Sequence, residues 1–329
     1  MTSKTRYFVL AAFGILALGL TTGLVASLSG FPVALTRAAG PDDLSYVPPQ
    51  AVAVAYANVQ EVMASELRQR LRKLEPDTHD REDFETKTGV NVERDIDTVV
   101  AAMLPLTDGA AGHDQRPLVV ARGRFDQVRI ETLARDHGAT VADYQGVRTI
   151  AHVGESGSMA LAFIEPGALA LGSAESVRAA IDAKRSGRSV LSNNDMMRLV
   201  SELDASNAWA VGRFDAMAGQ AGLPGDLQRK LPTLSWFSMA GHLNGGITGI
   251  FKAEAKDDEA ADNLRDMLRG GVAMAKLQAS DKPALKAMVD SLQLGGEGKT
   301  VAVGFSVPAE MFDALDALKG ARGVRRPAR

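Results

Sequence analysis

The triplet Gly298-Lys299-Thr300 has the residue types that close the phosphate-binding loop of nucleotide-binding proteins. That loop reads G-x-x-x-x-G-K-S/T, so its first glycine would stand at position 293, which is a glutamine. The loop must also open a helix whose N-terminus faces the phosphates. Here the following run, "VAVGFSV", has the composition of a strand. We therefore expect the triplet to lie in a tight turn that feeds a strand, and we expect no nucleotide as a partner.

Serine nucleophiles require a local signature, and the candidate segments lack it. "GESGS" (154–158) has no final glycine to complete a nucleophile elbow, so we expect a turn between strands there. "KTG" (87–89) and "SNN" (192–194) resemble fragments of penicillin-recognising enzymes, but their order is reversed. Ser-x-x-Lys occurs nowhere in the chain, so the nucleophile of that class is missing.

Metal and cofactor sites have no matching spacing either. The chain has no cysteine, and "ERDID" (93–97) has too few ligands for a calcium loop. The five histidines are scattered, without the i,i+4 spacing of a helical metal site: His79, His113, His137, His152 and His242. We therefore assign no catalytic, cofactor-binding or metal-binding residue, and we expect no cofactor.

The composition is that of an ordinary globular protein, and the chain is long enough for about two domains. The 329 residues carry a net charge of −3, so no overall positive charge favours nucleic acid. Aromatic residues make up 5% of the chain, which weakens any base-stacking surface. We expect no nucleic acid among the partners.

The N-terminus predicts export. Lys4 and Arg6 precede a stretch without charge that continues to Arg37, and residues 7–28 are long enough to span a bilayer as a helix. The positive flank should stay in the cytoplasm, which places the rest of the chain on the periplasmic or extracytoplasmic side of the inner (plasma) membrane. The alternative is a cleaved signal peptide, with small-residue sites at residues 25–27 or 37–39. The length of the uncharged stretch favours an uncleaved anchor.

The segments on either side of the folded part differ in character from it. "GPDDLSYVPPQ" (40–50) is rich in Pro, Gly and Asp, so we interpret it as a linker or an extended entry segment and place the start of the folded body near Pro49. The tail at 321–329 is basic and has no apolar face, which predicts disorder. Its charges could alternatively contact anionic lipid headgroups or wall polymer.

One pattern recurs between these ends: a β-type run, a polar break, then a run with helical period. The breaks contain residues that favour N-caps, namely Asp126, Ser173, Asp215, Asp257 and Ser306. "GRFD" occurs twice, at 123–126 and 212–215. We infer two related lobes at 41–190 and 191–320, with a helix over 191–203 whose apolar stripe serves core packing. "PAEMFDALDAL" (308–318) should form the helix that closes the second lobe.

Hairpin signals decide the fold class. Turn dipeptides stand at Gln145-Gly146, Pro166-Gly167 and Asn244-Gly245, each between two β-type runs. Hairpins require antiparallel pairing, whereas a doubly wound parallel fold alternates single strands with helices. We therefore predict an α+β fold: an N-terminal transmembrane helix, then two lobes of antiparallel sheet with helices packed on one face.

Three stretches together resemble a family of uncharacterised bacterial envelope proteins: "FETKTGVNVERDIDTVVAAM", "PLVVARGRFDQVRIETLARDHGATVADYQGVRTIAH" and "GSAESVRAAIDAKRSG". The resemblance covers most of residues 45–310 and rests on general pattern. It implies one N-terminal membrane segment and a duplicated α+β exterior. It implies no activity that could be carried to particular residues.

These observations favour a single-pass envelope protein with a non-catalytic binding or scaffolding exterior. Its partners would be the membrane, through residues 7–28, and envelope proteins or an envelope ligand. Two alternatives remain open: an exported hydrolase with a dispersed site, and a periplasmic carrier of an apolar ligand. A cleft that joins His137, His152 or His242 to an acid and a serine would favour the hydrolase, and a large apolar cavity would favour the carrier.

Overall fold

A computed structural model describes residues 42–69, 85–105, 115–154, 157–203, 206–217, 233–243, 245–280 and 283–308. The predicted membrane segment, the helix expected after Pro308 and the basic tail lie outside these residues. Of the helices that the structure describes, none combines the length and hydropathy that a bilayer span requires.

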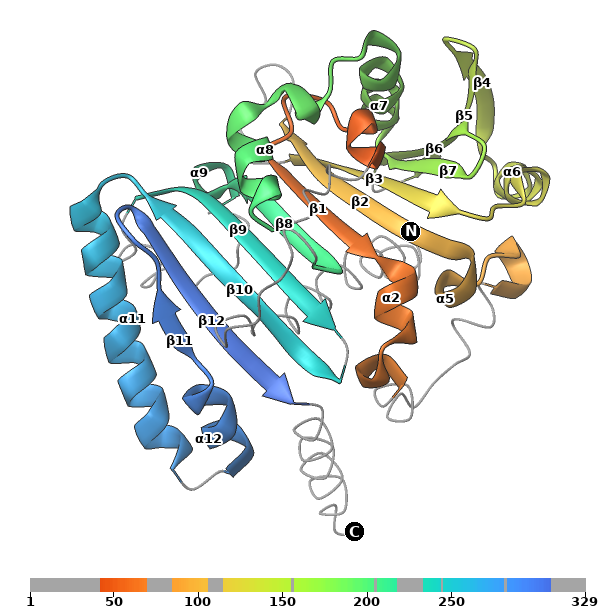
Figure 1. The fold of residues 1–329 in the computed structure, drawn as a ribbon. Coiled ribbons are helices and arrows are strands. Elements are labelled where there is room, and N and C mark those ends of the chain that lie inside the picture. The colour runs from red at the N-terminus through yellow and green to blue at the C-terminus, as the bar shows by residue number, and fades with distance from the viewer. Residues whose placement is uncertain are drawn as a thin grey trace, which may run out of the picture.

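The described strands form one antiparallel sheet, which confirms the α+β prediction (Figure 1). Their order across the sheet is β11-β12-β10-β9-β8-β1-β2-β3-β7-β6-β5-β4. The strands are β1 (Ala53–Asn58), β2 (Ile96–Pro105), β3 (Gln115–Gly123), β4 (Thr140–Tyr144), β5 (Val147–Gly154), β6 (Gly157–Glu165), β7 (Ala168–Gly172), β8 (Ala208–Arg213), β9 (Leu234–Leu243), β10 (Gly246–Ala255), β11 (Gln293–Gly295) and β12 (Thr300–Pro308).

The helices connect or flank these strands. They are η1 (Asp42–Tyr46), α2 (Val59–Ala64), α5 (Val92–Asp95), α6 (Gln127–Asp136), α7 (Ala174–Ser186), η2 (Val190–Ser192), α8 (Asn194–Ser201), α9 (Phe214–Met217), α11 (Asp258–Ala279) and α12 (Pro283–Asp290). The helix predicted over 191–203 is present as η2 and α8, and its apolar stripe is buried against β8 as expected: Met196, Leu199, Val200 and Leu203.

The two ends of the sheet have the same strand order when each is followed outward from the centre. On one side the order is β1-β2-β3-β7-β6, and on the other it is β8-β9-β10-β12-β11. The first side adds the hairpin β4-β5 at its outer edge. The sides meet where β1 pairs with β8, with Ala55 opposite Ala210. No sequence pattern predicted this pairing, which makes one continuous sheet.

Helices cover both faces of the sheet, so the prediction that they pack on one face is wrong. We call the face that bears Val54, Leu118 and Val211 the upper face, and the face that bears Ala55 and Val119 the lower face. η1, η2, α7 and α8 bury apolar side chains with the upper face. α11 buries Ala261 and Leu264 with residues of the lower face of β10 and β12. Successive side chains of a strand point to opposite faces of the sheet. Because apolar residues occur at both sets of positions, both faces of the sheet need to be covered.

The folded body begins before Pro49, so the prediction of a linker or an extended entry segment over 40–50 is wrong. Leu44, Tyr46 and Val47 are each 0% exposed and belong to the main core. η1 lies between α7 and β3, as the orange turn beside α7 shows in Figure 1. The Pro and Asp content suggested a linker because the apolar positions in this segment are too few to form a periodic pattern.

The predicted caps are correct in three of the five positions. Asp126, Ser173 and Asp257 accept backbone N–H groups at the starts of α6, α7 and α11. Asp215 instead lies within α9 and pairs with Arg213 at 2.5 Å. Ser306 lies in β12, opposite Thr248.

The two "GRFD" copies do not occupy equivalent places. The first follows β3 and leads into α6, whereas the second joins the end of β8 to α9. In the outward strand order, β3 corresponds to β10 and β8 corresponds to β1. The repeated tetrapeptide is therefore not a marker of the repeated strand order.

The hairpin predictions agree with the strand pairing. Gln145 and Gly146 have φ of 53° and 76°, the left-handed conformations of a tight turn between β4 and β5. Gly167 has φ of 77° between β6 and β7. β9 and β10 are also antiparallel neighbours, although Asn244 of their connection lies outside the described residues.

Candidate functional site

The triplet at 298–300 lies in the turn between β11 and β12, as predicted. Thr300 N–H donates to the Glu297 carbonyl at 3.0 Å, and Thr300 opens a strand. Arg265 of α11 donates to the carbonyls of Gly298 (2.5 Å) and Thr300 (2.9 Å). A phosphate loop needs backbone N–H groups at a helix start. This turn instead presents carbonyl oxygens to an arginine and leads into a strand.

Substitutions at the neighbouring Gly295 and Gly296 test the assignment of this segment as a tight turn between strands. Gly296 has φ of 94°, and a Cβ there would lie 2.2 Å from the Thr300 carbonyl oxygen, whereas a Cβ at Gly295 would meet no atom within 4 Å. We expect Gly296→Ala to lower the free energy of unfolding by about 2–4 kcal/mol, because the left-handed conformation and the backbone clash add. Gly295→Ala is the matched control and should change it by less than about 1 kcal/mol. Urea denaturation measures both, and equal effects would contradict this role of Gly296.

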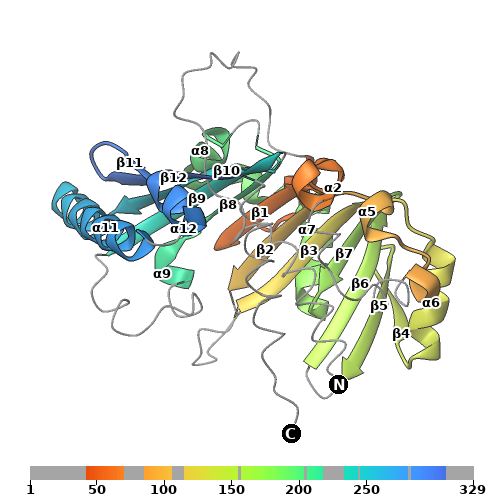
Figure 2. The same cartoon turned by 90° about the horizontal axis from the view of Figure 1, so that it is seen from below.

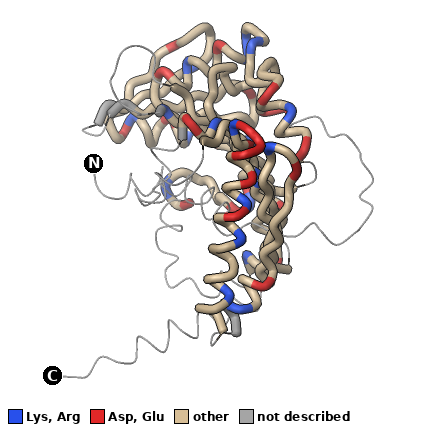
Figure 3. Tube along the Cα trace, turned by 90° about the vertical axis from the view of Figure 1, so that its left-hand side faces the viewer, with Lys and Arg blue, Asp and Glu red and all other residues tan. Residues whose placement is uncertain are grey.

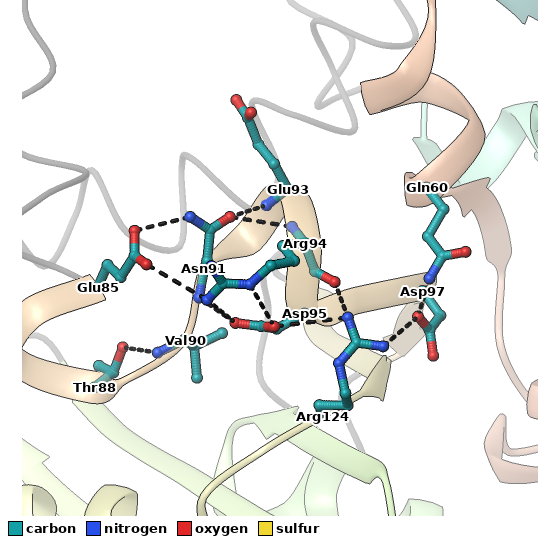
Figure 4. Close-up of polar contacts among 10 residues, drawn as sticks. All are labelled: Gln60, Glu85, Thr88, Val90, Asn91, Glu93, Arg94, Asp95, Asp97 and Arg124. Carbon is teal, nitrogen blue, oxygen red and sulfur yellow. Dashed lines mark hydrogen bonds and ion pairs between the residues drawn. The ribbon is translucent and has the colours of Figure 1, made fainter.

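The "ERDID" carboxylates form ion pairs with arginines (Figure 4). Asp95 accepts from Asn91 N–H at 2.9 Å and from Arg94 Nε at 3.2 Å, and Arg124 lies 3.6 Å away. Arg94, helped by the Asn91 N–H, holds the pKa of Asp95 below its usual range. The Asn91 side chain in turn caps α5.

The other carboxylates of that segment are also engaged. Glu93 pairs with Arg68 at 2.8 Å, and Asp97 accepts from Gln60 and lies 3.9 Å from Arg124. Their arginine partners supply the positive charge that a metal ion would otherwise provide. Among the described residues, no group of three or more His, Cys, Asp and Glu side chains could hold a metal ion.

A second polar cluster lies under α7 on the upper face. Arg122 of β3 donates to Asp43 Oδ1 through Nε at 2.8 Å and through Nη2 at 2.5 Å, and Nη2 also reaches Glu165 Oε1 at 3.1 Å. Thr98 donates to the other Asp43 oxygen at 3.0 Å. Lys184 of α7 lies 3.8 Å from Glu165.

This cluster shifts the pKa values of Tyr46, Glu165 and Arg122, and that of Arg122 is raised chiefly by its hydrogen bond to Asp43. Burial, and then the Glu165 carboxylate, raises the pKa of Tyr46 far above its ordinary value. The Tyr46 hydroxyl and then the Arg122 guanidinium hold the pKa of Glu165 below its usual range. Perturbed pKa values can mark active sites. Here each charge faces an opposite charge, and the groups join η1, β3, β6 and α7, so the cluster fastens the first segment to the core.

The histidines that the structure describes are far apart. His152 lies on β5 and His242 on β9, with six strands between them in the sheet, and His137 caps the end of α6. His137 Nδ1 lies 2.7 Å from the Leu133 carbonyl of its own helix. His79 and His113 lie outside the described residues. The described histidines therefore do not come together in a shared site of the kind that the hydrolase alternative requires.

An open groove of about 380 Å³ lies on the upper face in its second half. On β10 and β12 it is lined by Ile250, Ala302 and Gly304, and also by Lys252 and Thr300. Its rim is polar and includes Glu202, which pairs with Lys252 at 3.0 Å, and Glu297. Sequence reasoning missed this groove because its lining residues come from strands whose pairing was not known.

The lower face carries an apolar row across the central strands. Directly paired residues run from β9 to β6 without a polar side chain: Met239, Ala210, Ala55, Ala101, Val119, Leu171 and Leu161. The alanines at 101 and 210 are buried, while Ala55, Leu161 and Leu171 are half-buried. In Figure 2, α6 lies on one side of these strands and α9, α11 and α12 lie on the other. The helix with the main contacts to β3, β6 and β7 is α7, on the upper face.

Charged residues of both signs are interspersed on the side of the molecule that includes α11 (Figure 3). Along α11, Arg265 pairs with Asp262 and Arg269 pairs with Asp266. No continuous area of one sign appears in that view.

No protein-family model matches the chain, and no curated protein matches it. A solved structure described as "Structure of crystal form I of TP0453" is similar over 85% of this chain and 98% of that chain, with 13% identity and a TM-score of 0.45. Similarity at this level identifies neither a family nor an activity.

Proposed function

We propose that the protein is a membrane-attached, non-catalytic scaffold whose lower sheet face binds a protein partner through apolar contact. The observation that carries this proposal is the apolar row across β9, β8, β1, β2, β3, β7 and β6. An antiparallel sheet with one face in the core usually has a polar second face. A continuous apolar face indicates that something else covers it.

A binding role agrees with the chemistry of the polar clusters. The carboxylates around Asp95 and Asp43 are already paired with arginines and backbone N–H groups. A catalytic group has to be available to a substrate. These groups are bound to their own fold, which supports a scaffold over the hydrolase alternative.

The shape of the lower face favours a protein over a small ligand. Small-molecule sites are concave and enclose most of the ligand. The row lies on an extended sheet, and the 380 Å³ groove is on the other face. An extended apolar surface suits another protein surface, whereas a carrier of an apolar ligand would need an enclosed cavity.

Attachment to the membrane is part of the same proposal. Residues 7–28 would anchor the chain with its N-terminus in the cytoplasm, and residues 42–308 would lie in the extracytoplasmic space. We also propose that the two halves, 41–190 and 191–320, are structural repeats of one ancestral unit. The outward strand order, which is the same for five strands on each side, supports this origin.

Two neighbouring residues on opposite faces of β2 provide the stability test. Ala102 lies in the upper core at 2% exposure, and Met103 is half-buried on the lower face. Ala102→Glu should lower the free energy of unfolding by at least about 3 kcal/mol, since it buries an unpaired charge. Met103→Glu should lower it by less than about 1 kcal/mol. Chemical denaturation of the full chain in detergent measures both.

The partner is tested in cells with the same variant. A photo-reactive amino acid at Leu171 should crosslink to a protein of defined mass, and Met103→Glu should reduce that product at least tenfold. The same photo-reactive group at Val128, which is 77% exposed on α6, is the control and should not give this product. Crosslinks only within the chain, or equal destabilisation by both glutamates, would overturn the proposal. A lipid adduct alone would instead favour the carrier.

A further inference from the structure

We propose that residues 309–320 form an amphipathic helix that occupies the groove on the upper face of β10, β12 and β11. The groove would then be an intramolecular docking site, and its partner is a named segment of this chain. This inference concerns the upper face and is independent of the scaffold proposal, which concerns the lower face.

The first half of the molecule already contains this arrangement. α7 follows β7 directly and packs on β7, β6 and β3. In the outward strand order these strands correspond to β12, β11 and β10, which line the groove. α7 buries Val177, Ala180 and Ile181 in the main core. The groove is therefore the place where the equivalent of α7 would lie.

The floor of the groove is built for close approach of a helix. The upper face of β7 shows only Ala168, Ala170 and Gly172 to α7. The upper face of β12 likewise shows Ala302 and Gly304. Small residues let a helix backbone lie close to the sheet. A ligand site of this size would instead require convergent polar groups that are free to bind it, and here the ammonium of Lys252, beside Ala302, is already paired with Glu202.

A helix of residues 309–320 would be long enough to extend from the end of β12 into the groove. Twelve residues of helix span about 18 Å, which equals roughly five to six residues of strand. A helix that turns back after Pro308 would therefore reach the level of Ala302, inside the groove. Pro308 is a suitable start, because proline favours the first position of a helix and cannot continue the strand ladder.

The side chains of the segment match those of α7 in pattern. When Pro308 is placed against Ser173, four of the five buried positions of α7 correspond to large apolar residues, and the fifth, Ile181, corresponds to Asp316. Ser176, Val177, Ala180 and Ala183 are matched by Met311, Phe312, Leu315 and Leu318. These residues recur at i, i+1, i+4 and i+7, which places them on one side of a helix. Asp313 and Glu310 fall on the opposite side.

The proposed helix and α7 also have a lysine at the corresponding position near their ends. The same placement aligns Lys319 with Lys184, which lies 3.8 Å from Glu165 at the end of β6. The corresponding turn, between β11 and β12, carries Glu297 at the rim of the groove. A docked helix would bring the Lys319 ammonium to Glu297, as Lys184 is brought to Glu165.

Cysteine pairs in the full chain test the docking without ambiguity, because the chain has no native cysteine. Ile250 lies in the floor of the groove, so the pair Ile250→Cys with Leu315→Cys should react with a short bismaleimide within one chain. The matched control is Ile250→Cys with Asp313→Cys, whose second cysteine lies on the opposite side of the proposed helix. We expect the first pair to crosslink at least tenfold faster than the control.

Charge reversal provides a second measurement that does not depend on the cysteine variants folding. Lys319→Glu should increase hydrogen exchange of residues 311–318 at least tenfold, and Lys319→Glu combined with Glu297→Lys should restore the original protection. Equal crosslinking rates for the two pairs, products only between chains, or fast exchange of 311–318 in the unaltered protein would overturn the proposal.

Discussion

A chain that begins at residue 41 is expected to fold and to leave the membrane, whereas a chain that begins at residue 49 is expected to remain unfolded. The difference is the segment that forms η1. Leu44, Tyr46 and Val47 are fully buried, and each such side chain contributes about 1.5–3 kcal/mol. The longer deletion also removes Asp43 and leaves Arg122 without its main partner. The combined loss is comparable to the whole stability of a typical domain, about 5–15 kcal/mol.

Fractionation and circular dichroism distinguish the outcomes. The full chain should pellet with membranes, and the chain from residue 41 should appear in the soluble fraction with a cooperative thermal transition. A chain from residue 41 that carries Tyr46→Ala separates loss of η1 packing from loss of the anchor. Membrane association of the chain from residue 41 would contradict the single-anchor proposal. A cooperative transition for the chain from residue 49 would contradict the role of η1.

Arg122→Met is expected to lower the free energy of unfolding by about 3–5 kcal/mol, the usual effect of removing one partner from a buried pair. The substitution leaves the Asp43 carboxylate, whose side chain is 6% exposed, without the guanidinium that faces it. Arg124→Met is the matched control two residues along the chain. The Arg124 side chain is 61% exposed and lies 3.6 Å from Asp95, so its loss should cost less than about 1 kcal/mol.

The pH dependence of stability provides a second readout for the same variant. The pKa of Glu165 is lowered in the folded state, so its contribution is present above the ordinary value of 4.5 and is lost as the pH falls. Arg122→Met removes one cause of that shift and should flatten the loss of stability on the acid side. Urea denaturation between pH 3 and pH 7 measures the slope. An unchanged slope, or equal destabilisation by the two methionines, would contradict the role of the cluster.

Sequence reasoning was reliable where the signal is local. Turn dipeptides predicted the β4–β5 and β6–β7 hairpins, and the caps at Asp126, Ser173 and Asp257 were correct because a cap depends on a few adjacent residues. The rejection of a phosphate loop at 298–300 also rested on local order, namely a strand after the triplet.

The failures concern contacts between distant segments. Asp43 meets Arg122 across 79 positions, so a segment rich in Pro and Asp was interpreted as a linker although it belongs to the core. The groove and the apolar row depend on which strands are neighbours, and pairing such as that of β1 with β8 has no local signature. Alternation of residues along a strand shows that two faces exist but does not show what covers them.

The pairing of β1 with β8 has a consequence for how such a molecule could arise. Because the two strands are antiparallel and the strand order is the same outward from them, the join has the arrangement of a two-fold symmetric interface. A single half of the chain would expose this strand as an open edge, and two copies of that half could pair there to rebuild the sheet. Fusion of the copies would make the pairing independent of concentration. It would also free the halves to diverge, one gaining the β4-β5 hairpin and the other the long helix α11.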